Sequence, residues 1–202
     1  MARRLAAINA YEFPSSVRSR FNLQHQSLSA EEIGIVESGT RQWYRLVARH
    51  PKAKLAMPSA VVDDMWHEHV LHTRDYAAFC DIAFVRFLHH TPESAMTAEG
   101  AADNQTAGLA TTYRLAQQDE AGRLPLLFRV DADLGITGGR RYLADCGGRG
   151  QCHDMPGTIC LQHIAGPGRG FRGRWMPSSE YGRYPGDGGG GAHGCGGGCG
   201  GS

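Results

Sequence analysis

The stretch VVDDMWHEHVLHTRDYAAFC, residues 61–80, decides the fold and raises the question of function. It follows Ser59, a good N-cap residue, and its apolar residues recur at helical spacing. The helical pattern continues to His90, with an expected break near Cys80–Asp81. Residues 61–90 also hold five of the chain's ten histidines. The stretch is therefore either a functional site or a helix that uses histidine in its packing.

Helical geometry separates the polar residues of this stretch onto two faces. His67 and His69 lie about 200° apart around an unbroken helix, so they cannot easily bind one ion together. The sequence HEHVLH also lacks the i, i+4 histidine pair of zinc proteases, so Glu68 is not predicted to be a metalloprotease base. One face forms an apolar stripe with His69 in its middle: Val62, Trp66, His69, Thr73, Tyr76 and Cys80.

Two sites are compatible with these faces. In the first, His69 points into a helical bundle, where a second helix presents His89 or His90. In the second, Asp63 lies one helical turn before His67 and orients its ring or completes a metal shell. The structural alternatives are a hydrogen-bonded core histidine and an ordinary Asp–His contact at i, i+4.

Other helical segments surround this stretch. Ser29 and Glu32 form a capping-box pattern ahead of an amphipathic run. The segment 124–136 is apolar and short, and it could be a strand or an extended cover. Further helices are expected near residues 14–24, 29–50 and 102–122. The expected fold is mainly α: a compact bundle of about four or five helices followed by an irregular Gly/Cys-rich C-terminal region.

Glycine divides the chain into three parts, because 23 of its 28 glycines lie after residue 134. Glycine loses much conformational entropy on ordering and offers no side chain to bury. We expect a helical domain at 5–134, a Gly/Cys/His-rich irregular region at 135–185, and a disordered Gly/Cys tail at 186–202.

A second group of candidate ligands lies in the glycine-rich region, in the pattern C-x5-C-H-x6-C-x2-H. Thiolate and imidazole ligands suit tetrahedral zinc, and a metal would stabilise a segment that has few apolar residues. Scattered cysteines in a flexible segment are the alternative. The members of the group are Cys146, Cys152, His153, Cys160 and His163.

The end of the chain carries weaker signals. His193, Cys195 and Cys199 could capture soft metals or oxidise. An arginine- and aromatic-containing segment, residues 166–175, slightly resembles RG-rich nucleic-acid binders. Its three arginines supply only a few phosphate contacts, which argues against a nucleic-acid partner.

The composition favours a cytoplasmic protein without a membrane association. The chain has no run of about 18 apolar residues, so no membrane span is expected. Its first residues lack the cleavage pattern of a signal peptide. In a reducing compartment, the six cysteines are interpreted as thiols or metal ligands before disulfides.

The histidine stretch resembles the signature of the glycine-rich domain proteins, known from plants and with shorter bacterial relatives. The resemblance covers roughly residues 25–135, and the Gly/Cys-rich ending is also similar. It implies a helical domain that is followed by a glycine-rich region, and it implies no particular reaction for that domain. The candidate site residues that it singles out are Asp63, His67, His69, His89 and His90. Some plant members carry an RNA-recognition module, whose aromatic signature this chain lacks. The matching residues are Pro58, Ser59, Val62, Asp63, Trp66, His67, His69, Leu71, Thr73, Tyr76, Phe79, Cys80, His89, His90 and Pro92.

Together these patterns favour a non-enzymatic metal-binding or interaction protein. One alternative is a metal-dependent hydrolase that uses the histidine cluster to activate water. The other is a metal-free adaptor or a weak RNA binder, which would use the Gly/Arg-rich tail as its contact surface. The partner of an adaptor would be an unidentified protein. The expected cofactor is zinc or another divalent transition metal. Its candidate ligands are Asp63, His67, His69, His89, His90, Cys146, Cys152, Cys160 and His163.

Overall fold

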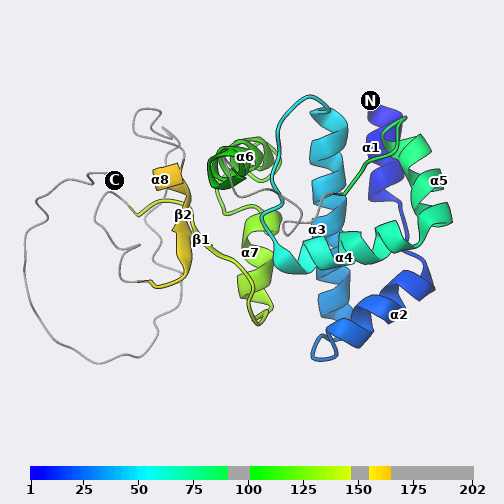
Figure 1. Ribbon diagram of the computed structural model, residues 1–202, viewed down its shortest axis with the longest axis horizontal. Helices are drawn as coiled ribbons and strands as arrows, with labels where there is room; N and C mark the ends of the chain where they lie inside the picture. The colour runs from blue at the N-terminus through cyan, green and yellow to red at the C-terminus, as the bar shows by residue number, and fades with distance from the viewer. Residues whose placement is uncertain (91–100, 147–154, 165–202) are drawn as a thin grey trace, which may run out of the picture. The chain divides into compact units, whose positions relative to one another are not determined.

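The computed structural model describes residues 1–90, 101–146 and 155–164, and these are mainly helical, as the sequence predicts (Figure 1). Within them, no helix combines the length and the apolar composition that a membrane crossing requires. The helices are α1 (Ala2–Asn9), α2 (Ser15–Gln24), α3 (Ala30–Arg49), α4 (Ala60–Leu71), α5 (Thr73–Ala83), α6 (Ala101–Ala116), α7 (Leu126–Asp133) and α8 (Leu161–Ile164). The strands are β1 (Arg141–Leu143) and β2 (Thr158–Cys160).

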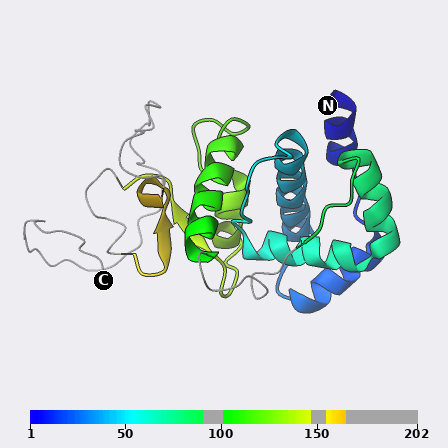
Figure 2. The ribbon, with the colours of Figure 1, turned by 45° about the horizontal axis from the view of Figure 1, so that its top comes forward.

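The longest helix, α3, is central, since it packs against α1, α4, α6 and α7 (Figures 1 and 2). It begins with the predicted capping box. The Glu32 amide donates to Ser29 Oγ at 3.2 Å, and the Ser29 amide donates to Glu32 Oε2 at 2.7 Å. These bonds satisfy backbone donors that the first helical turn would otherwise leave unpaired.

The histidine stretch forms two helices, not one. The break lies at His72 and not near Cys80–Asp81, and the second helix ends at Ala83 instead of His90. The His72 side chain is 2.8 Å from the Glu68 carbonyl oxygen, at the end of α4. The change of direction allows α5 to pack against both α4 and α1.

Segment 126–133 is a helix, α7, and neither a strand nor an extended cover. Leu127, Val130 and Asp131 are buried at helical spacing on its inner face. The Asp131 carboxylate reaches the first turn of α4, where it accepts hydrogen bonds from Ser59 Oγ at 2.5 Å and the Ala60 amide at 2.8 Å. It therefore satisfies donors at the positive end of the α4 dipole.

The chain after α7 turns into a short parallel sheet. The Arg140 amide also donates to Asp131, at 2.8 Å, which fixes the start of β1. Tyr142 in β1 donates to the Pro58 carbonyl oxygen at 2.7 Å, and Tyr142 is buried with the helical core. β1 pairs with β2 so that Leu143 lies opposite Cys160. α8 follows β2 directly and packs against α6.

The expected three-part division at residues 134 and 185 stays a prediction, and the expected tail at 186–202 lies outside the described residues. The described residues after 134 include the two strands and α8.

We predict that Asp131→Ala lowers the free energy of unfolding by about 3 kcal/mol, because it removes a buried acceptor and leaves several donors unpaired. Urea unfolding followed by circular dichroism measures the change. Asp133→Ala is the matched control. Its carboxylate is exposed and pairs with Arg129, so we expect a loss below about 1 kcal/mol. Equal losses in the two variants would contradict the role of Asp131.

Candidate metal centre

His69 lies in the core and not in a site. Its ring is fully buried, and both nitrogens are hydrogen-bonded: Nε2 to the Tyr11 hydroxyl at 2.9 Å and Nδ1 to the Tyr44 hydroxyl at 2.9 Å. A neutral imidazole has one donor and one acceptor nitrogen, so one tyrosine donates and the other accepts. Burial lowers the pKa of His69 to about 3 and, with a smaller contribution from His72, keeps the ring neutral.

His90 lies apart from His69 and pairs with an acid. Its Nε2 is 3.0 Å from Asp63 Oδ1, and its ring packs edge-on against Trp66. The exposed His67 contacts the His90 ring, with the ring centroids 4.8 Å apart. Asp63 is therefore bonded to His90, and not to His67 as the helical spacing suggests.

The structure does not bring the histidines of this stretch together around one point. Both ring nitrogens of His69 are hydrogen-bonded to tyrosine hydroxyls, whereas the His90 ring is hydrogen-bonded to Asp63. His89 is exposed and contacts Phe87. Among residues 1–90, 101–146 and 155–164, the group of three or more ligand side chains that could hold a metal ion is formed by Cys146, Cys160 and His163.

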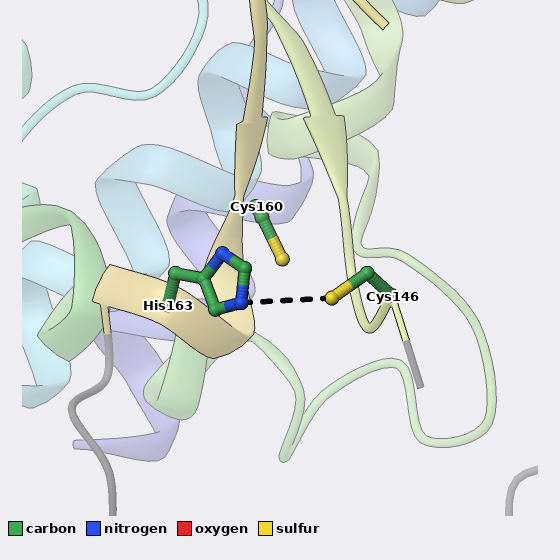
Figure 3. A group of neighbouring side chains, drawn as sticks. All are labelled: Cys146, Cys160 and His163. Carbon is green, nitrogen blue, oxygen red and sulfur yellow. Dashed lines mark hydrogen bonds between the residues drawn. The ribbon is translucent and has the colours of Figure 1, made fainter. Parts of the chain in front are cut away.

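In that group, one ligand atom from each residue lies within 4.8 Å of the others. Cys146 Sγ is 3.6 Å from His163 Nε2, and the Cys146 thiol is 3.4 Å from the Gln162 amide oxygen. The three side chains point toward a common space (Figure 3). For tetrahedral zinc, bond lengths of about 2.3 Å to sulfur and about 2.0 Å to nitrogen place the two ligand atoms about 3.5 Å apart.

The fold explains why these residues meet. β1 and β2 are parallel, so their C-terminal ends lie at the same edge. Cys146 follows the end of β1, Cys160 ends β2, and His163 lies in α8, which begins at the next residue. Both thiols are buried and His163 is exposed, so the group has an accessible side.

The other candidate ligands of the C-terminal region lie outside the described residues. Cys152 and His153 fall in the stretch 147–154, and the tail ligands and the arginine-rich segment follow residue 164. The sequence interpretation missed Gln162, whose amide no metal-ligand spacing would indicate. It also missed the tyrosine partners of His69, which are distant along the chain.

The family model UCP032817-like matches residues 3–164, more than half of the chain. The chain belongs to the UCP032817-like family. The resemblance to the glycine-rich domain proteins is therefore wrong, and nothing found shows that family. No curated protein and no solved structure matches the chain.

The buried His69 predicts a pH dependence of stability. Its pKa falls from 6.5 to about 3 on folding, so the unfolded chain binds the proton more readily. The contribution is complete above pH 6.5 and is lost as the pH falls toward 3. Between pH 7.5 and pH 5 we expect the wild type to lose about 2 kcal/mol of unfolding free energy from this residue.

Urea unfolding at both pH values tests this. His69→Gln should show a smaller pH dependence, by about 2 kcal/mol, even though it is less stable at pH 7.5. His67→Gln, which replaces an exposed ring, should retain the wild-type pH dependence. An unchanged dependence in His69→Gln would show that another group is responsible.

Proposed function

We propose that this is a non-enzymatic metal-binding protein in which Cys146, Cys160 and His163 hold one zinc ion. The observation that carries the proposal is the convergence of the three ligand atoms within 4.8 Å. Cys146 and Cys160 are 14 residues apart (160 minus 146) in the sequence, so their approach results from the pairing of β1 with β2 and not from local chain geometry.

The donor chemistry supports zinc. Cysteine thiolates and a neutral imidazole are the usual ligands of structural zinc sites. Soft sulfur ligands select zinc or copper(I) over the magnesium and calcium ions that prefer oxygen. The group contains no carboxylate.

We further propose Cys152 as the fourth ligand. It lies between Cys146 and Cys160 in the sequence, and a structural zinc site is closed by four protein ligands, whereas a catalytic site keeps one position for water. A closed site would join the chain after β1 to the chain after β2. This favours a structural role for the metal over the hydrolase alternative.

Metal analysis of the purified full-length protein tests the site. We use a Cys195→Ser/Cys199→Ser background so that the tail thiols do not contribute. One zinc per chain is expected. Cys146→Ser, Cys160→Ser, His163→Ala and Cys152→Ser should each weaken zinc binding at least tenfold in competition with a chromophoric chelator, because each removes one of four ligands.

Cys80→Ala is the control for a lost thiol. Cys80 is buried in α5, where burial raises its pKa, and it is not a member of the ligand group. This variant should keep its zinc. Less than one zinc per chain in the background protein, or an equal loss in Cys80→Ala, would refute the site. Wild-type affinity in Cys152→Ser would refute the fourth ligand alone.

Removal of the metal should loosen one region selectively. After chelation, we expect faster amide hydrogen exchange in residues 141–146 and 158–164, because the metal no longer links the strands to α8. The amides of α3 serve as the internal reference, because this helix lies in the core and is distant from the ligands in the sequence. They should stay protected. Uniform loss of protection would indicate global unfolding, and no change would contradict the structural role.

A further inference from the structure

A cavity of about 450 Å³ lies between α3, α4 and α6, and none of the described residues that line it belongs to the metal centre. Residues 50–51, 53–57, 86 and 88–90, together with Arg140, complete its described walls. Its volume falls within the range of about 300–1,000 Å³ that small-molecule sites occupy in proteins. The cavity is therefore large enough for a ligand with an aromatic ring and a few substituents.

The charged side chains of the lining are mostly basic. It includes Lys54, Arg86 and Arg140 and, among the described residues, a single carboxylate, Asp63. That carboxylate is already paired with His90. Positive charge on walls of low polarity attracts anions, because the surrounding protein screens the field less than water does.

Two of the polar groups are held in place by the fold. Asp63 fixes Nε2 of His90, so Nδ1 is the ring nitrogen left for another partner. Arg140 Nη1 donates to the Met57 carbonyl oxygen at 2.5 Å, which holds this guanidinium in the wall. A binding site needs polar groups whose positions are fixed before the ligand arrives.

An aromatic wall accompanies these charges. Trp43 and Trp66 both line the cavity, with their ring centroids 5.7 Å apart. Trp43 is only 4% exposed, and its Nε1 has no hydrogen-bond partner among the described residues. A buried donor without a partner is costly, and such a group in a native structure commonly marks a place where a ligand or water supplies the acceptor.

We infer that this cavity binds a small organic anion that combines a carboxylate or phosphate group with a planar apolar body. The basic side chains hold the anionic group, and the two indoles contact the apolar body. The described residues of the two sites do not overlap, so we expect anion binding to be independent of zinc.

Tryptophan fluorescence of the full-length protein tests the inference, with benzoate and phenyl phosphate as probes and benzyl alcohol as the neutral control. A Trp175→Phe background leaves Trp43 and Trp66, which both line the cavity, as the tryptophans of the chain. We expect a saturable change with at least one anion and at least tenfold weaker binding of the alcohol. The two anions distinguish carboxylate from phosphate recognition.

Lys54→Gln/Arg86→Gln replaces two exposed cations of the lining, so it should fold normally and bind the anion at least tenfold more weakly. Lys52→Gln/Arg74→Gln replaces two exposed cations outside the lining and should bind within twofold of the background protein. The inference is overturned if neither anion gives a saturable change, if the alcohol binds as tightly, or if both double variants bind equally.

Discussion

The carboxylate of Asp131 is the interaction on which the rest of the structure depends. It accepts hydrogen bonds from the start of α4 and from the chain that leads into β1. One buried charge thus positions the helix that carries His69 and the strand that leads to Cys146. A buried carboxylate is stable only when its lone pairs are occupied, and here the donors come from both elements at once.

The local parts of the fold could be predicted from the sequence, and the parts that need distant partners could not. The hydroxyls of Ser29 and Ser59 cap their helices by accepting a hydrogen bond from the backbone amide three residues further on, a short spacing that can be seen in the sequence. By contrast, the Asp131 carboxylate accepts a hydrogen bond from the Ser59 hydroxyl, which lies 72 residues away in the sequence. Segment 126–133 was ambiguous because a short apolar run fits a strand or a helix, and only packing decides between them.

For the candidate site, too, local placement could be predicted from the sequence, and contacts between distant residues could not. The helical spacing correctly placed His69 on the apolar stripe, but its partners Tyr11 and Tyr44 are 58 and 25 residues away. These hydroxyls turn a potential ligand into a neutral part of the core. Cys160 and His163 are close in the sequence, whereas their approach to Cys146 depends on two three-residue strands, which are too short to give a periodic pattern.

The distance between Ser59 and Asp131 also affects how the chain is made. At ~5–20 residues per second, synthesis of the intervening chain takes on the order of ten seconds. During that time the first turn of α4 has no carboxylate to accept its donors, and the apolar residues of this helix lack the α7 surface against which they pack. The nascent protein therefore leaves the first turn of α4, and the side of this helix that packs against α7, uncovered until the ribosome has released α7.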